Sequence, residues 1–361
     1  MKINKIKENF LPVSFNLITA TFLSHAFFKL SFNDWIYSEF EIYKNIEKTT
    51  LDNYPFYLES PLFFILKKIF FIENIDVYLL VVYLFFNFCV LLICLNINFL
   101  GPYGPLFFFS GWLVTCSWFL GYVDILSALL LVIISKWILL NKKNFSSWAF
   151  IFLLLAFNHF GIFIFSIISF IFLIDKKYRK KLLYSSFIGG FIASVLKNLY
   201  LDYINFAGRG RIRMLFNQNI LDDATNFISE FLPSLIWSGF LGCIFILFLI
   251  IFVKEYSFSQ KYIISSFVAL LGTGIVVDSS RIFSILLIPT ILFLIFEISK
   301  YQFVKTYSEK VLITLIIFST FYLQERHVFG YVRNVSPNLE NESVYNFLAR
   351  IVNSVMKNIW I

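Results

Sequence analysis

One short polar break interrupts the apolar second half of the chain. Asp278 and Arg281 are the only charged residues between Lys261 and Glu297. Their i, i+3 spacing turns both side chains the same way if the break leads into a helix. Two interpretations fit: a helix cap beside a snorkelling arginine, or an ion pair that lines a site at one membrane face. The positions of the other polar residues decide between them.

Further side chains with acid–base or ligand chemistry stand at the ends of apolar runs. Asp34 follows the first run, where it is either a solvated loop acid or a catalytic carboxylate. Asp124 precedes a run, so it suits a helix cap or a substrate contact. His159 lies among phenylalanines, where a histidine is more often a packed core residue than a ligand. Each residue therefore has a structural and a functional interpretation.

Arginines gather in a later polar segment, where Arg209, Arg211 and Arg213 lie beside two glycines. A guanidinium fork matches the oxygens of a phosphate or pyrophosphate, and the alternative is contact with anionic lipid headgroups. The sequence has no Walker loop, dinucleotide fingerprint, HExxH motif or serine-hydrolase elbow. The four cysteines lack metal-ligand spacing. We therefore expect no soluble nucleotide substrate, no cofactor and no protein metal site, with a divalent metal left open.

The composition is typical of a membrane protein. Of 361 residues, 59% are hydrophobic and 14% are charged, and the apolar runs reach the length of a spanning helix. A β-barrel would require short segments of alternating polarity, which are absent. Lysines at cytoplasmic helix ends explain the net charge of +8, so we expect no nucleic-acid partner. We predict an all-α, polytopic integral membrane protein with about 10 to 11 transmembrane helices.

The positive-inside rule orients the chain, because lysines precede its first apolar run. The N-terminus is then cytoplasmic and the C-terminus external. We expect a single domain, 1–361, with external segments at 31–61, 201–230 and 324–361. The end of the last segment is amphipathic and suited to lying on the membrane. In this topology the candidate residues collect at the external face, which is the main indication of function.

Two apolar segments lead to specific expectations. One helix should run outward from the Gly101–Pro105 turn to about Leu120. The segment 146–174 has lysines on both flanks, so both of its ends should be cytoplasmic. This requires a hairpin of two short helices that meet at Asn158 and His159. Interrupted helices of this kind line cavities in membrane proteins.

Several short motifs follow one another along the chain: Asn33-Asp34-Trp35, Asn53-Tyr54-Pro55-Phe56, Gly121-Tyr122-Val123-Asp124, Asn158-His159 and Asp278-Ser279-Ser280-Arg281. Their layout covers most of the chain and resembles the glycosyltransferase C superfamily, multi-spanning enzymes that use polyprenyl-phosphate-linked sugars. The resemblance implies that Asp34 is the catalytic base and that arginines bind phosphate. The chain differs from some members in lacking a large soluble C-terminal domain, and from several in having a single acid directly after the first helix. Acceptor and metal dependence therefore stay open.

We expect an inverting glycosyltransferase of cell-envelope polysaccharide biosynthesis in a bacterial inner membrane. It would move a sugar from a polyprenyl-phosphate donor to a glycan, lipid or protein acceptor at the external face. Asp34 is the expected base, and the expected substrate contacts are Asp124, His159, Arg209, Arg211, Asp278 and Arg281. One alternative is a polysaccharide polymerase or ligase of the O-antigen type, which would rely on the external arginines. Another is a lipid or solute transporter with polar groups near the midplane.

Overall fold

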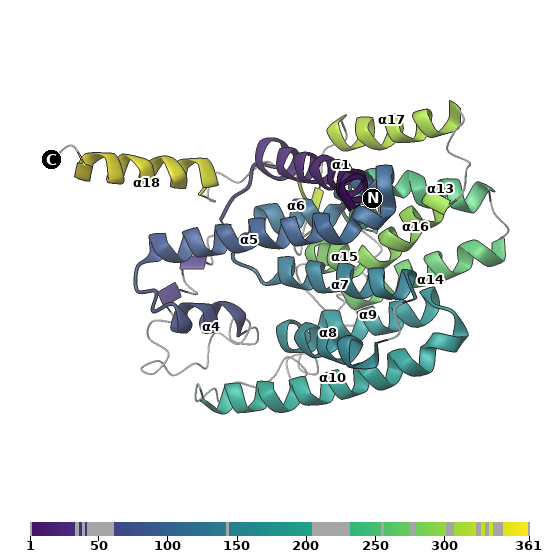
Figure 1. Cartoon of the computed structure of the whole chain (residues 1–361), viewed down its shortest axis with the longest axis horizontal. Coiled ribbons are helices and arrows are strands. Elements are labelled where there is room, and N and C mark those ends of the chain that lie inside the picture. Colours follow the sequence, from purple (N-terminus) through teal and green to yellow (C-terminus); the bar gives the residue numbers. More distant parts are fainter. Residues whose placement is uncertain are drawn as a thin grey trace.

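The chain is almost entirely helical wherever the structure describes it (Figure 1). The computed structural model describes residues 2–32, 36–37, 40–41, 61–141, 144–203, 232–253, 256–273, 279–300, 307–322, 326–328, 332–334 and 342–359. Two short strands, β1 (Arg326–Val328) and β2 (Val332–Asn334), pair antiparallel. The predicted helical class is confirmed, with this strand pair as an addition that the sequence analysis did not foresee.

The described part of the first half of the chain contains helices of very different length. Its elements are α1 (Lys2–Thr21), the π-helical turn η1 (Phe22–Phe27), α4 (Leu62–Ile69), α5 (Ile75–Ile97), the 3₁₀ segment η3 (Asn98–Phe108), α6 (Gly111–Trp118) and α7 (Asp124–Leu139). Asn74 caps α5, because its side-chain oxygen accepts a hydrogen bond of 2.7 Å from the Asp76 amide.

The second half continues the helical pattern. Its elements are α8 (Phe145–Asn158), α9 (Phe160–Leu173), α10 (Lys176–Tyr203), the turn η4 (Leu241–Cys243), α13 (Ile244–Val253), α14 (Tyr256–Thr273), α15 (Ser279–Leu286), α16 (Ile288–Lys300), α17 (Tyr307–Tyr322) and α18 (Val344–Ile359). The α18 helix covers most of the amphipathic end of the segment 324–361, whose place on a membrane stays a prediction.

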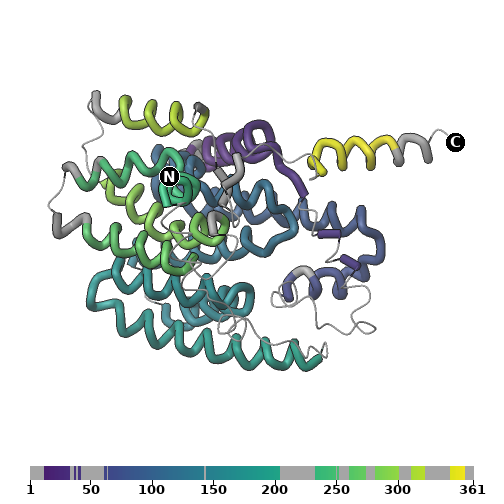
Figure 2. Tube along the Cα trace, turned by 180° about the vertical axis from the view of Figure 1, so that it is seen from behind, coloured from purple at the N-terminus to yellow at the C-terminus, as the bar shows by residue number. Residues whose placement is uncertain are grey.

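The helices form a bundle in which most members run along a common direction (Figure 1). α10 lies along one flank and α17 along the opposite one, and the view from behind shows the same arrangement (Figure 2). α18 projects past one end of the bundle. Because the helices are roughly aligned, the turns between them gather at two ends, and polar residues in those turns can meet.

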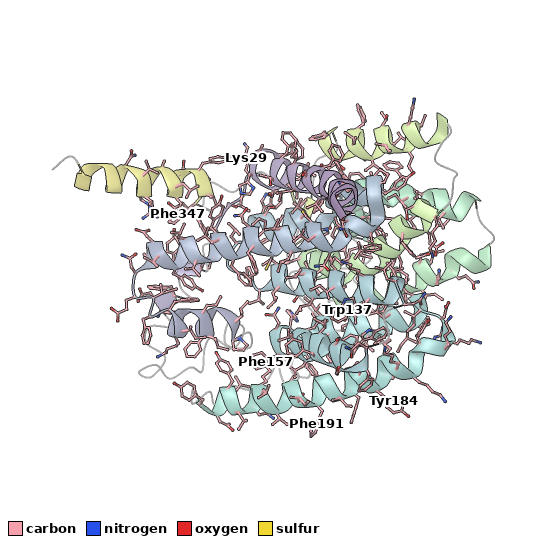
Figure 3. The ribbon with its side chains drawn as sticks, in the orientation of Figure 1. Lys29, Trp137, Phe157, Tyr184, Phe191 and Phe347 are labelled. Atoms are coloured by element: carbon pink, nitrogen blue, oxygen red, sulfur yellow. The ribbon has the colours of Figure 1, made fainter. Side chains whose placement is uncertain are left out.

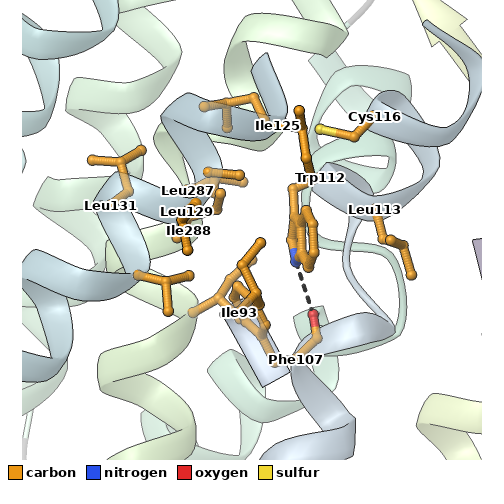
Figure 4. Packing of buried hydrophobic residues seen from close by; sticks show 14 of the residues in the cluster. Ile93, Phe107, Trp112, Leu113, Cys116, Ile125, Leu129, Leu131, Leu287 and Ile288 are labelled. Carbon is orange, nitrogen blue, oxygen red and sulfur yellow. Dashed lines mark hydrogen bonds between the residues drawn. The ribbon is translucent and has the colours of Figure 1, made fainter. Parts of the chain in front are cut away.

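The core is built from large apolar side chains contributed by distant segments. The Trp112 ring is fully buried and stacks on Phe107, with ring centroids 5.0 Å apart. Its indole Nε1 donates a hydrogen bond of 3.1 Å to the Phe107 carbonyl, as Figure 4 shows beside Ile93 and Leu287. This bond satisfies a polar group that would be costly to bury unpaired.

The expected helix from the Gly101–Pro105 turn to Leu120 is wrong in its extent. The chain instead forms the 3₁₀ segment η3, kinked at Gly101, and then α6, a helix of eight residues. Every residue of α6 is buried. This apolar run therefore forms an internal helix. Its short length and apolar composition fit a buried core helix as well as part of a spanning helix.

Two of the described helices are long and apolar enough to cross a membrane, judged by length and composition. They are the α5–η3 unit, residues 75–108, and α10. α10 also exposes large apolar side chains, among them Tyr184 and Phe191, which project from the bundle in Figure 3. The expected number of spans stays a prediction.

At one end of the bundle, lysines contact polar or aromatic side chains of the helices. Lys136 Nζ donates to Asn96 Oδ1 at 3.1 Å, near the C-terminal ends of α5 and α7. Lys181 lies 4.3 Å from the Trp148 ring centroid, at the start of α8, which follows α7 directly. Lys300 lies 4.0 Å from the Phe296 ring, which in turn meets Phe99 of η3. We call this the basic end.

Candidate functional site

A buried ion pair joins two helix starts at the end of the bundle opposite the basic end. Arg281 lies in the first turn of α15, and Asp124 is the first residue of α7. The Arg281 Nη1 donates to Asp124 Oδ2 at 2.5 Å, and their side chains are 11% and 2% exposed. Charge-assisted hydrogen bonds of this kind are short and strong. We call these two residues the buried pair, and this end of the bundle the pair end.

Tyr122 covers the guanidinium of the buried pair. The Arg281 Cζ lies 4.3 Å from the Tyr122 ring centroid, within the range of a cation–π contact. Tyr122 stands in a tight turn, because its amide donates to the Phe119 carbonyl at 3.1 Å. Gly121 has a φ of 109°, which other residues rarely adopt, and a Cβ there would lie 2.7 Å from Ile36. The turn geometry therefore requires glycine and orients the tyrosine ring.

The break between α8 and α9 attaches to the first turn of α7. Asn158 Nδ2 donates to the Val123 carbonyl at 3.0 Å and to Ser127 Oγ at 2.9 Å. His159 is extended, with φ −151° and ψ 97°, and its Nδ1 accepts a hydrogen bond of 3.3 Å from the Ile162 amide. His159 therefore caps α9, while Asn158 holds the break beside Asp124.

The predicted break at Asn158 and His159 is confirmed, and the chain folds back there. A continuous helix would separate Phe152 from Phe163 by about 16 Å along its axis. Their ring centroids are instead 6.1 Å apart. The Lys181–Trp148 contact also brings the starts of α8 and α10 together at the basic end. This agrees with the expectation that both lysine-rich flanks share one side.

The first turn of α15 is fixed by hydrogen bonds as well as by the ion pair. Ser284 Oγ donates to the Arg281 carbonyl at 2.9 Å. Ser284 Oγ also lies 3.0 Å from Thr115 Oγ1, a buried hydroxyl on α6. The backbone that carries the arginine is therefore attached to α6, while its side chain is attached to α7. Such double attachment limits the geometries that the guanidinium can adopt.

A short backbone ladder connects the pair end to the chain before Asp34. The Ser31 amide donates to the Ser117 carbonyl at 2.9 Å, and the Leu120 amide donates to the Ser31 carbonyl at 3.3 Å. On the other side, the Phe32 amide donates to the Glu342 carbonyl at 3.0 Å. The described chain thus reaches the segment 31–61, which is predicted to be external, next to the turn that carries Tyr122.

The structure brings together only some of the predicted site residues. Asp124 and Arg281 are in direct contact, and His159 lies next to Asn158, which bonds the α7 start. The predicted partner of Arg281 was Asp278; the described partner is Asp124. Four of the predicted residues lie outside the described part of the chain and stay predictions: Asp34, Arg209, Arg211 and Asp278.

Sequence reasoning did not assign a role to Tyr122 or Ser284, and it placed Asn158 at the helix break without predicting its contacts. A usable signal existed for Tyr122, because it stands in the same turn as Asp124. Within the described residues, no group of three His, Cys, Asp or Glu side chains could hold a metal ion.

What the arrangement can do chemically follows from its charge. A guanidinium held between a carboxylate and an aromatic face is pre-oriented, so it can stabilise an anion with little reorganisation. The oxygens of a phosphate match its planar fork. The chain matches no protein-family model, no curated protein and no solved structure.

Proposed function

We propose that the protein is a membrane glycosyltransferase that moves a sugar from a polyprenyl-phosphate donor to a glycan, lipid or protein acceptor. The observation that carries this proposal is the buried pair, Arg281 and Asp124, with Tyr122 on the guanidinium. Sugar transfer from a lipid phosphate leaves negative charge on the departing oxygen. A pre-oriented guanidinium at that oxygen favours the transition state over the ground state.

The outer surface of the bundle supports a membrane location. Large apolar side chains are exposed on α1, α5, α10, α14 and α17, for example Phe15, Phe88, Phe187, Phe267 and Phe318. Contiguous exposed apolar surface is typical of contact with lipid or with partners. Small residues at four-residue spacing on α10, Ser185, Gly189 and Ala193, are buried, and a Cβ on Gly189 would lie 2.5 Å from the Ala149 carbonyl oxygen of α8. Close helix contact through small residues is common in membranes.

The distribution of charge supports an orientation. Lys136, Lys181 and Lys300 lie at the basic end. The buried pair lies at the other end, where α7 and α15 begin. Lysines favour the cytoplasmic side of a membrane. In this proposal the pair end faces the outside, where a lipid-linked sugar would be consumed.

The chemistry of the proposal is a single displacement. Asp34 takes the proton from the acceptor hydroxyl, and the resulting oxygen attacks the anomeric carbon with inversion. The bond from that carbon to the phosphate oxygen breaks, and the phosphate leaves with the electron pair. Arg281 balances the charge on the leaving phosphate, and Asp124 keeps the guanidinium oriented. Arg209 and Arg211 provide further phosphate contacts, Asp278 supports the arginine turn, and His159 contacts sugar hydroxyls.

Transfer of labelled sugar in proteoliposomes tests this proposal. We expect the full chain to transfer sugar from a polyprenyl-phosphate donor, and Asp34→Asn to abolish transfer at equal protein level. Glu73→Gln, which changes an exposed acid just before α5, is the matched control and should be silent. Wild-type transfer by Asp34→Asn would refute the assigned base.

The same preparation separates the alternative functions. Transfer of a whole glycan from a lipid pyrophosphate, lost in Arg209→Lys and Arg211→Lys but kept in Asp34→Asn, would identify a polymerase or ligase. Movement of substrate across the vesicle membrane without any transfer would identify a transporter.

A further inference from the structure

The first two turns of α10 hold a dense group of cations that the proposed reaction does not use. The group consists of Lys176, Lys177, Arg179, Lys180 and Lys181. We call it the α10 collar. The neighbouring acid is Asp175, whose Oδ2 lies 3.8 Å from Lys177 Nζ, with both side chains largely exposed. An exposed pair at this distance contributes little, so the collar keeps a strong positive charge.

The position of the collar on its helix is unfavourable without an external anion. The start of a helix carries partial positive charge, and cations there are repelled rather than stabilised. The first turn of α10 contains no acidic residue to offset them. Like charges within one or two turns repel each other as well. Natural proteins keep local conflicts of this kind mainly at functional sites, and a bound anion would offset this one.

Aromatic rings and an apolar surface adjoin the collar. Lys181 Nζ lies 4.3 Å from the Trp148 ring centroid, and Lys177 Nζ lies 4.9 Å from the Tyr178 centroid. Beyond the collar, α10 exposes a continuous series of large apolar side chains, which includes Leu183, Phe187, Phe191, Val195 and Leu199. Cationic side chains with adjoining aromatic rings are thus followed by large apolar side chains along a single exposed helix.

The length of the exposed series corresponds to a bilayer. Tyr184 and Tyr203 are 66% and 70% exposed near its two ends. At 1.5 Å per residue the helix rises about 28 Å between them. The hydrocarbon core of a bilayer is about 30 Å thick, and tyrosines favour its two interfaces. With Tyr184 at one interface, the collar lies at headgroup level.

We propose that the α10 collar binds the headgroups of anionic phospholipids in the leaflet at the basic end. The proposal uses the membrane location in the proposed function and is independent of sugar transfer. A lipid leaflet satisfies the cations and covers the apolar series at once. A nucleic acid or a soluble acidic protein would satisfy only the cations.

Native mass spectrometry of the full chain tests this surface without any sugar donor. The protein in neutral detergent is titrated with dioleoyl-phosphatidylglycerol or dioleoyl-phosphatidylcholine, and bound lipids are counted. We expect the anionic lipid to bind at least tenfold more tightly. Lys176→Gln with Lys180→Gln should remove most of that preference, since each surface cation contributes about fivefold. Lys29→Gln with Lys68→Gln, two exposed lysines elsewhere in the chain, is the matched control and should keep the preference.

A second variant changes binding in the opposite direction. Asp175→Asn removes the acid beside Lys177, so it should strengthen phosphatidylglycerol binding, by up to about fivefold. Such a gain cannot result from misfolding. Equal affinity of the wild type for both lipids, an undiminished preference in the double lysine variant, or unchanged binding by Asp175→Asn would each overturn the proposal. None of these results depends on whether the protein transfers sugar.

Discussion

Arginine–carboxylate contacts join helices at two places in the described part of the chain, and the two places differ in their surroundings. Arg281 and Asp124 join α15 to α7 with side chains 11% and 2% exposed. Arg350 joins α18 to α5, through Asp76 at 2.8 Å and Glu342 at 3.2 Å, with side chains 49%, 38% and 23% exposed. We call the second set the surface network. The same ionic chemistry therefore occurs in a dry and in a wet environment.

The difference in burial decides what each contact can do. In water, screening and side-chain entropy reduce an exposed ion pair to about 0–1 kcal/mol. In a dry environment, removing one partner leaves a buried charge without compensation, which costs about 3–5 kcal/mol. The buried pair is therefore expected to control both stability and the orientation of Arg281. The surface network is expected to position α18 and little else.

The largest expected effect is that of Asp124→Ala. Because it leaves Arg281 charged in a buried position, unfolding free energy should fall by about 3–5 kcal/mol. The measurement is thermal or denaturant unfolding in a fixed detergent.

A double variant separates the structural from the chemical role of the buried pair. Asp124→Leu with Arg281→Met replaces both charges by apolar groups, so it should recover most of the lost stability. Sugar transfer should nevertheless stay absent, since no guanidinium remains. Transfer at the wild-type rate by this variant would show that the buried pair has a structural role alone.

A packing variant should lose an amount of unfolding free energy that lies between the losses expected at the two ionic contacts. In Gly189→Val the new side chain would meet α8, because even a Cβ lies 2.5 Å from the Ala149 carbonyl oxygen and 2.7 Å from the Leu153 nitrogen. Overpacking of this kind costs about 1–3 kcal/mol. The same unfolding assay should rank this variant between the buried pair and the surface network. Val195→Leu, on the exposed side of α10, is the control and should be neutral.

Removing the surface network should have a small effect. Arg350→Gln loses its contacts with Asp76 and Glu342, so we expect a loss of about 0–1 kcal/mol that shrinks at high salt. Unfolding is measured at low and high ionic strength. A loss as large as that of Asp124→Ala would remove the distinction between the two contacts.

The surface network should also respond to alkaline pH. Burial, and then the hydrogen bond to Glu342, raises the pKa of Tyr37 well above its usual range. The folded state therefore favours the neutral phenol. Its contribution is complete below the unfolded pKa of about 10 and is lost as pH rises toward the folded pKa. Wild type should lose stability above that pH more steeply than Tyr37→Phe; parallel curves would contradict this.

The sequence predicted the break at His159 but not the partner of Arg281. Lysines on both flanks of 146–174 are a local signal, and they required a hairpin. The ion pair with Asp124 joins residues that are far apart in the chain, and no periodicity reports such a contact. The i, i+3 spacing indicated Asp278 as the partner of Arg281 instead.

The case of α6 shows a second limit of the sequence. An apolar run has the same composition whether it faces lipid or the core, so hydropathy alone cannot separate the two. α6 is buried on all sides and ends at Trp118, whose Nε1 donates to the Phe28 carbonyl. Its environment depends on α15 and η1, which lie elsewhere in the chain.

Sugar transfer by Arg281→Lys tests the central claim most directly. A lysine keeps the positive charge beside Asp124 but cannot reproduce the planar fork on a phosphate. We predict that transfer in proteoliposomes falls by about 10- to 100-fold, equivalent to ~1.5–3 kcal/mol, while unfolding stability changes much less. Arg350→Lys in the surface network is the matched control and should transfer normally. Near-wild-type transfer by Arg281→Lys would contradict the account.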